Sequence, residues 1–249
     1  MGAPPSGLVR IAAAGDLHFG RYSPGTFQKL FGEVAAAADI LVIPGDLTDY
    51  GLPDEARALA RELAQAVKIP IVAVLGNHDY ESGHSGDVAE ILREAGVIVL
   101  DGDSSEVHGI GFAGVKGFGG GFGPNALGSW GEPVIKAFVQ ESVNEALKLE
   151  TALARLRTPV KIALVHYAPI QETVAGEPER IYPYLGSSRL EEPINRFGVT
   201  AVFHGHAHRG QPESRTSAGV PVYNVSLPLL TRLTPDRPFR VVEVPGTIA

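Results

Sequence analysis

Residues 74–80 read VLGNHDY, and they join an apolar run to three consecutive polar side chains. The run, residues 69–75, has the length and the β-branched content of a strand buried on both faces. It stops at a glycine, and Asn77, His78 and Asp79 follow directly. An ordinary strand end needs only a turn, so an amide, an imidazole and a carboxylate at this point suggest a functional site.

Four other short apolar runs end in the same way. Each leads into a carboxylate or an imidazole: LVRIAAAGDLH (residues 8–18) into Asp16 and His18, ILVIPGDLTD (40–49) into Asp46 and Asp49, VKIALVHYAP (160–169) into His166, and VTAVFHGHAH (199–208) into His204, His206 and His208. In several clusters a glycine stands directly before a polar residue, where it permits a sharp turn and a close approach of the backbone. The pattern therefore repeats at five separate strand ends.

Helical patterns lie between these runs. Apolar residues recur at the spacing of one helix face over residues 54–67 and 139–156, and segments near 24–37, 86–95 and 188–197 also have helical patterns. Alternating strands and helices predict an α/β fold with largely parallel pairing. In such sheets ligands gather beyond the carboxyl ends of the strands, so we expect the five polar clusters to converge.

The composition limits the class of protein. The 249 residues fit one domain, residues 1–249, and a hydrophobic content of 44% allows a sizeable core. The net charge of −7 and the lack of a Lys/Arg cluster argue against binding to extended nucleic acid. With no cysteine, the chain has no disulfide, thiolate ligand or cysteine nucleophile. The start lacks a signal-peptide pattern and no apolar run reaches the roughly 20 residues of a membrane helix, so we expect a cytoplasmic protein with no membrane partner.

The converging residues carry donor atoms that suit metal ions. They offer imidazole nitrogens and hard oxygens but no sulfur, from Asp16, His18, Asp46, Asn77, His166, His206 and His208. This mixture suits Mn, Fe, Zn or Ni better than Ca, which prefers oxygen ligands alone. Seven donors exceed the need of one tetrahedral zinc, so the set favours two divalent metal ions that share a bridging carboxylate.

The ordered blocks resemble those of the calcineurin-like metallophosphoesterase family. The family pattern is D-x-H, then G-D-x-x-D, then G-N-H-[DE], then a lone His, then G-H-x-H. This chain has all five blocks in that order, at residues 16–18, 45–49, 76–79, 166 and 205–208. The blocks span most of the chain, and each stands at the end of an apolar run. The resemblance implies a four-layer α-β-β-α sandwich in which two mixed sheets are flanked by helices.

The resemblance also implies a role for each residue. The first metal would be held by Asp16, His18 and His208, the second by Asn77, His166 and His206, and both by the bridging Asp46. His78 would face the substrate, where it protonates the leaving oxygen or stabilises the transition state. Two divalent ions about 3.5–4 Å apart can hold a bridging hydroxide, lower its pKa and clamp the phosphoryl oxygens during in-line attack.

A dimetal phosphoesterase, and within that class a phosphodiesterase acting on a small phosphate ester, is the leading hypothesis. The GDLTD and GNHD blocks look most like the cyclic-nucleotide phosphodiesterase-like branch of the family. Two alternatives are a non-catalytic scaffold that binds partners with the same fold, and a nuclease. The complete ligand set argues against the scaffold, and the acidic balance argues against the nuclease.

Other residues beside the blocks have supporting interpretations. We interpret His204 as a packing residue or as a support for the ligands. Asp49 and Asp79 are candidates to accept a hydrogen bond from a metal-bound histidine, because such histidines commonly donate their second N–H to a carboxylate. Arg209 and Tyr167 flank predicted ligands, and either contact with substrate or ordinary surface placement fits them.

Two long connections complete the set of candidates. The glycine-rich stretch 114–131 is either a mobile loop over the site or a plain surface connection. The segment 168–188 follows His166 and is long for a loop in a compact domain, where such loops are often functional. From this segment, Arg180, Tyr182 and Tyr184 are candidates to line a specificity pocket.

Overall fold

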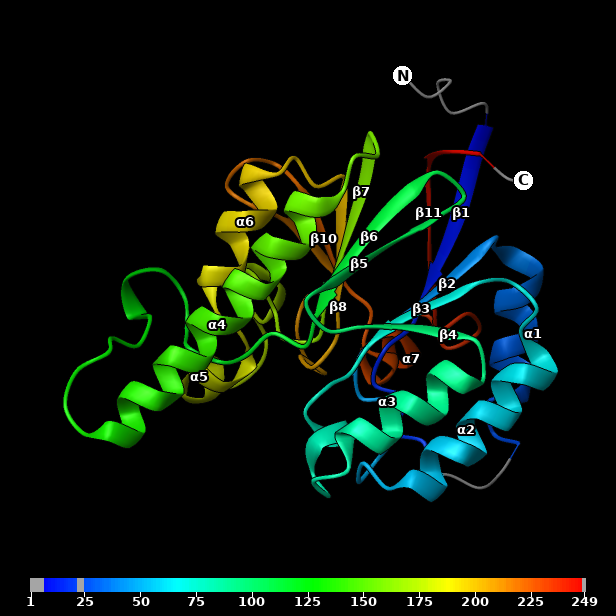
Figure 1. The fold of residues 1–249 in the computed structure, drawn as a ribbon, viewed down its shortest axis with the longest axis horizontal. Coiled ribbons are helices and arrows are strands. Elements are labelled where there is room, and N and C mark those ends of the chain that lie inside the picture. Colours follow the sequence, from blue (N-terminus) through cyan, green and yellow to red (C-terminus); the bar gives the residue numbers. More distant parts are fainter. Residues whose placement is uncertain (1–6, 22–24, 248–249) are drawn as a thin grey trace.

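The computed structural model describes residues 7–21 and 25–247, which form two β-sheets with helices on the outer faces (Figure 1). The first sheet has five strands in the order β11-β1-β2-β3-β4, with β1 to β4 parallel and β11 antiparallel to β1. Its strands are β1 (Gly7–Ala13), β2 (Ile40–Pro44), β3 (Ile71–Val74), β4 (Val97–Leu100) and β11 (Arg240–Gly246).

The second sheet has six strands in the order β5-β6-β7-β8-β10-β9. The four inner strands are parallel to one another, and the two edge strands are antiparallel to their neighbours. The strands are β5 (Asp103–Val107), β6 (Ile110–Val115), β7 (Val160–Val165), β8 (Ala201–His204), β9 (Glu213–Arg215) and β10 (Pro221–Asn224). Both sheets are therefore mixed.

The helices connect and cover these strands. The α-helices are α1 (Gln28–Ala37), α2 (Pro53–Ala66), α3 (Ser85–Glu94), α4 (Pro133–Arg155), α5 (Tyr182–Leu185), α6 (Glu191–Arg196) and α7 (Leu227–Leu233). Short 3-10 helices are η1 (His78–Tyr80), η2 (Gly123–Asn125), η3 (Gln171–Thr173), η4 (Glu179–Ile181) and η5 (Ser188–Leu190). No helix among the described residues is long and apolar enough to cross a membrane.

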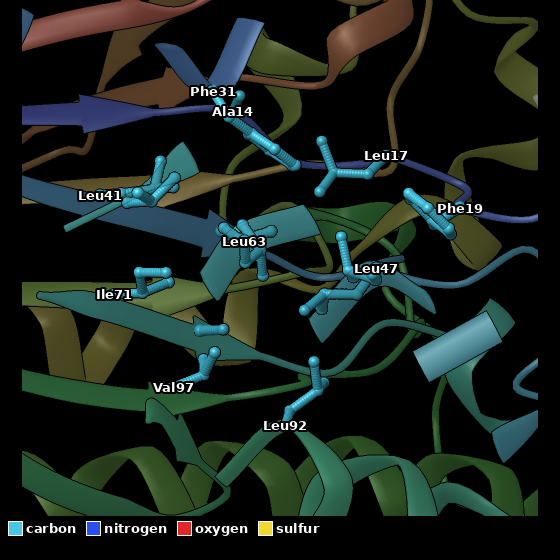
Figure 2. Packing of buried hydrophobic residues seen from close by; sticks show 14 of the residues in the cluster. Ala14, Leu17, Phe19, Phe31, Leu41, Leu47, Leu63, Ile71, Leu92 and Val97 are labelled. Carbon is cyan, nitrogen blue, oxygen red and sulfur yellow. The ribbon is translucent and has the colours of Figure 1, made fainter. Parts of the chain in front are cut away.

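The outer face of the first sheet is buried under α1, α2 and α3. Phe31, Leu63 and Leu92 project from these three helices onto Leu41 and Ile71 of the strands, in the cluster that Figure 2 shows. Each such side chain, when fully buried, stabilises the fold by about 1.5–3 kcal/mol relative to an exposed position. This gain explains why the apolar stripe of each helix faces the sheet.

Two further apolar clusters complete the layers. Between the sheets, Ile11 and Val42 of the first sheet pack in one cluster with Phe112, Leu164 and Phe203 of the second. The other face of the second sheet is covered by apolar residues of α4 and α6. The order helices, sheet, sheet, helices confirms the predicted four-layer sandwich with two mixed sheets.

The predicted helices lie close to the observed ones, with three differences. The helix predicted over 24–37 begins at Gln28, and residue 24 lies outside the described residues. The helix predicted over 139–156 begins at Pro133, because proline suits the first helical position and the exposed first turns carry no core stripe. The helix predicted near 188–197 is divided into η5 and α6.

The parallel strands bring the polar clusters to one edge of the sandwich. Backbone hydrogen bonds tie the loops that leave the strands to one another: Asp16 N–H donates to Gly45 O at 2.9 Å and His18 N–H donates to Asp46 O at 3.0 Å. The loop after β8 bonds to the loop after β7 through Gly205 N–H and His166 O at 3.2 Å, and to the loop after β1 through His206 N–H and Asp16 Oδ1 at 2.9 Å. The loops after β1, β2, β7 and β8 thus form one connected layer.

Candidate metal centre

The predicted ligands of the first metal lie together. Donor atoms of Asp16, His18 and His208 are all within 4.8 Å of one another. His208 Nε2 lies 2.9 Å from Asp16 Oδ1, and both Asp16 oxygens accept a hydrogen bond from the backbone N–H of His206. Three side chains from the loops after β1 and β8 therefore surround one point.

The predicted ligands of the second metal form an adjoining group. Donor atoms of Asp46, His166 and His206 are within 4.8 Å of one another. His166 Nε2 lies 2.9 Å from Asn77 Oδ1 and 3.4 Å from Asp46 Oδ1, so the amide of the GNHD block joins the same group. The loops after β2, β3, β7 and β8 supply these residues.

Asp46 lies between the two groups. Its Oδ1 faces His166, and its Oδ2 is 3.8 Å from Nε2 of His18. A carboxylate that directs one oxygen toward each group can contact two metal ions at once. The structure thus brings together all seven residues that the sequence nominated as ligands.

The backbone at this site adopts a conformation that side chains rarely take. Among the described residues, five that are not glycine have positive φ, and four of them are predicted ligands: Asp16, His18, Asp46 and His206. Such angles cost free energy, and they persist where the surrounding structure holds them for a functional purpose. Here the strained turns direct side chains from separate strand ends into one pocket.

Glycine lets the loops approach closely. A Cβ atom at Gly205 would collide with Asp16 Oδ2, and one at Gly45, where φ is +91°, would collide with the ring of His166. The two glycines thus leave room for a carboxylate and an imidazole that belong to other loops.

We expect Gly205→Ala to lower activity by about a hundredfold, because a catalytic group displaced by about 1 Å loses that much. Metal content, measured by elemental analysis, is expected to fall with it as Asp16 is pushed aside. Gly32→Ala is the matched control, since a Cβ at Gly32 in α1 meets no atom within 4 Å. Equal activity in the two variants would contradict the close packing at Gly205.

Backbone carbonyl groups fix the ring nitrogens of two ligands. His166 Nδ1 lies 3.1 Å from Pro44 O, and His206 Nε2 lies 3.0 Å from Tyr184 O. A carbonyl only accepts, so each of these nitrogens carries the proton and the opposite nitrogen keeps its lone pair. His166 Nε2 and His206 Nδ1 are therefore the atoms that can bind a metal ion.

Asp49 and Asp79 have different roles from each other. Asp49 Oδ1 lies 3.3 Å from Nδ1 of His18 and 2.7 Å from the guanidinium of Arg21, so it faces a predicted ligand but does not form the expected hydrogen bond with it. Asp79 bonds to backbone groups instead of a histidine ring. It accepts hydrogen bonds from the backbone N–H of Thr48 at 2.8 Å and of Gly76 at 2.8 Å, and it thereby joins the GDLTD loop to the GNHD loop.

Two other histidines of the blocks are placed clearly. His78 lies beside the first group, with its ring centroid 4.4 Å from that of His18, and a side-chain exposure of 34% leaves it open to solvent. Its Nδ1 is 2.7 Å from Asp49 O, and its backbone N–H donates to Asp46 Oδ1 at 2.9 Å. His204 is fully buried with Nε2 bonded to Thr173 Oγ1 at 2.9 Å, which is a packing position.

Three of the four predicted histidine ligands are held in the form that binds metal ions, whereas at His208 the effect of burial is outweighed by the hydrogen-bonded Asp16 carboxylate, which raises the pKa of the imidazole. Burial lowers the pKa of His18 to about 4, and it also lowers the pKa values of His166 and His206. All three are therefore neutral at neutral pH, and neutral imidazole is the ligand form.

Asp46, the carboxylate between the two groups, is by contrast shifted away from the ionised form that binds metal ions. Burial and the neighbouring Asp16 and Asp79 raise the pKa of Asp46, because a second and third negative charge lie close in a site that excludes water. A divalent cation beside Asp46 would favour its ionised form.

The surroundings of the His18 ring indicate whether the residues present fit a metal ion. Both of its ring nitrogens are buried and lack a hydrogen-bond partner. A buried polar group without a partner costs roughly 1–3 kcal/mol, so native structures seldom leave one. A metal ion would supply a partner for Nε2, which lies on the side of Asp46, while Nδ1 faces the Asp49 carboxylate. The residues present therefore fit the implied group.

The two long connections line a cavity next to the second group. The cavity has a volume of about 400 Å³, and it is bordered by Phe118 from stretch 114–131 and by Tyr184 from segment 168–188. Residues 117–122 are largely buried, so the first part of the glycine-rich stretch is a wall rather than a surface connection. Tyr182 lines a separate cavity, and Arg180 lines neither of the two.

Comparison with known proteins identifies the family. Residues 9–210 match the model of the calcineurin-like phosphoesterases. The match covers most of the chain, so the protein belongs to the calcineurin-like phosphoesterase family. As a member of that family, it is a metal-dependent phosphoester hydrolase. Its His/Asp clusters can hold metal ions.

Solved structures agree on the fold. The phosphopantetheinyl hydrolase PptH of Mycobacterium tuberculosis is 16% identical, the alignment covers 97% of each chain, and the TM-score is 0.68. The TT1561 protein of Thermus thermophilus is 18% identical over 95% of this chain and 99% of that chain, with a TM-score of 0.57. At such low identity the likeness shows the fold alone. A comparison with curated proteins finds no match.

Proposed function

We propose that this protein hydrolyses small phosphodiesters with two divalent metal ions bound at the converging loops. The observation that carries the proposal is Asp46, a buried carboxylate with one oxygen toward His18 and the other toward His166. That position suits a ligand shared by two ions. We further propose that residues 1–249 act as one domain, since the C-terminal strand β11 pairs with β1 in the first sheet.

The ligand assignment follows the two groups. Asp16, His18 and His208 hold the first ion, and Asn77, His166 and His206 hold the second. Asp46 contacts both. The nitrogen and oxygen donors suit Mn, Fe, Zn or Ni, and no sulfur is present to favour a softer ion. When bound, two such ions supply an activated water and positive charge that stabilises the phosphoryl oxygens.

His78 has the position of the group that assists the leaving oxygen. It is open to solvent beside the first group, and the Asp49 carbonyl fixes its ring through Nδ1. Because Nδ1 donates to that carbonyl, Nε2 is the nitrogen available to the substrate. An imidazole can hold a proton near neutral pH and give it to a leaving alkoxide.

The test has two stages. Purified protein loaded with Mn²⁺ is first assayed for metal content, and we expect about two ions per chain because the residues form two ligand groups around one carboxylate. The loaded protein is then given a panel of small phosphodiesters and phosphomonoesters. Faster hydrolysis of the diesters is the expected result. A protein that holds two ions and hydrolyses no member of the panel would contradict the proposal.

A further inference from the structure

We infer that the cavity beside Asn77 and His206 binds an aromatic ring of the substrate, on the ester arm that stays attached to phosphorus. The inference rests on the proposed function and adds a substrate class to it: diesters with an aromatic group on the arm that is not released. The cavity of about 400 Å³ is near the lower limit of ligand pockets, which run from about 300 to 1,000 Å³.

Aromatic rings form a continuous wall from the surface to the metal centre. Tyr184 and Phe138 lie 6.1 Å apart between ring centroids, Phe138 and Phe118 4.9 Å, and Phe118 and Tyr167 5.8 Å. The ring of Tyr167 is 4.5 Å from that of His206, which ends the series at a predicted ligand. Such a wall favours a flat apolar group, since aromatic pairs gain from offset and edge-to-face contact beyond the area they bury.

The cavity and the ring of His78 lie beside different metal positions. His78 groups with His18 and Asp46 near the first metal position, whereas the cavity is lined by Asn77 and His206 of the second. If His78 assists the leaving oxygen, the leaving arm extends over the first position. An arm that enters the cavity is then the one that remains on phosphorus, and only a diester has such an arm.

The inner wall of the cavity is held in place from behind. The ammonium of Lys116, which does not line the cavity, lies 4.8 Å from the ring centroid of Phe118 and 5.3 Å from that of Tyr167. Gly117 N–H, one residue on, donates to the buried carboxylate of Glu145 at 2.8 Å. A wall that is fixed before binding loses little entropy when a ligand enters, which favours recognition of one shape.

The experiment compares two pairs of probes, and the members of each pair differ only in a phenyl or a methyl group on the arm that stays on phosphorus. Binding of phenylphosphonate and methylphosphonate to the Mn²⁺-loaded protein is measured by calorimetry, and hydrolysis of 4-nitrophenyl phenyl phosphate and methyl 4-nitrophenyl phosphate is followed by release of 4-nitrophenolate. We expect phenylphosphonate to bind about tenfold more tightly than methylphosphonate, the upper end of what an aromatic contact contributes. Tyr184→Ala should cut the preference for the phenyl probe by about three- to tenfold in both measurements.

Tyr182→Ala is the matched control. Tyr182 lies two residues away in the same short helix α5 but lines a separate cavity, so its loss should leave the phenyl preference unchanged. Tyr184 has an exposure of 62%, and the thermal midpoints of both variants show whether they are folded. Equal affinity for the two phosphonates, or an equal loss in the two variants, would overturn the inference. If phenylphosphonate binds more tightly than methylphosphonate but neither ester is hydrolysed, the inferred role of the cavity would stand and the proposed function would be refuted.

Discussion

Replacing Asp46 with asparagine is expected to lower activity at least about a thousandfold, because shared charge stabilisation by two metal ions contributes several kcal/mol and each 1.36 kcal/mol is tenfold in rate. Asparagine keeps the shape of the side chain and tolerates the positive φ of 49° at this position. It also keeps an oxygen that can accept the N–H of His78. The variant therefore removes the charge between the two groups and little else.

Metal content and stability separate this effect from misfolding. Elemental analysis is expected to show at most one ion per chain, since the shared ligand is lost. The metal-free variant should unfold at the same temperature as the metal-free parent or higher, because the buried Asp46 carboxylate lies close to those of Asp16 and Asp79. An Asp46→Asn variant that retains two ions and full activity would show that Asp46 does not bridge them.

Asp39→Asn is the matched control for the charge change. Asp39 stands directly before β2, whereas Asp46 follows the opposite end of the same strand. Its carboxylate pairs with the guanidinium of Arg10 at 2.7 Å, far from the metal centre along the strand. Loss of this pair should leave metal content and turnover unchanged and lower the free energy of unfolding slightly.

The site could be predicted from the sequence because each apolar run and the polar residues that follow it can be recognised locally along the chain. The runs that became β1, β2, β3, β7 and β8 are apolar, short and followed at once by polar residues. Parallel pairing brings the carboxyl ends of β1, β2 and β3 to one edge of the first sheet and those of β7 and β8 to one edge of the second. The face-to-face packing of the two sheets then places these two edges side by side. These local signals were enough to nominate the seven ligands, whereas the four-layer architecture with two mixed sheets was implied by the resemblance of the five ordered blocks to the calcineurin-like family.

The rest of the fold lacked such signals. β5 has the sequence DSSEV and is nowhere fully buried, and β9 is only three residues long, so neither shows an apolar run or a clear alternation. The supports of the ligands were missed for another reason. Pro44 and Tyr184 hold histidine rings through backbone carbonyls, and any residue type offers the same group. Asp79 was expected to bond a histidine, but three-dimensional packing turned it to the backbone of Thr48 and Gly76.

Replacing His78 with alanine is expected to keep both metal ions and to slow turnover by about 10²–10⁴-fold on esters with poor leaving groups, the usual contribution of a general acid. The loss should shrink to about tenfold or less for 4-nitrophenyl esters, because 4-nitrophenolate leaves without a proton. A series of diesters with leaving groups of rising pKa measures this directly. The plot of log rate against that pKa should be steeper for the variant than for the parent protein.

The matched control is His84→Ala, six residues further along the same connection. His84 is exposed, and its Nδ1 lies 2.9 Å from Asp87 Oδ2 at the start of α3. It should give the same plot as the parent protein. Since His78 Nδ1 is bonded to the Asp49 carbonyl group and Nε2 is left for substrate, a merely structural His78 would slow all esters alike. Parallel plots for His78→Ala and the parent, or full activity of His78→Ala on an unactivated ester, would therefore remove His78 from the proposed step.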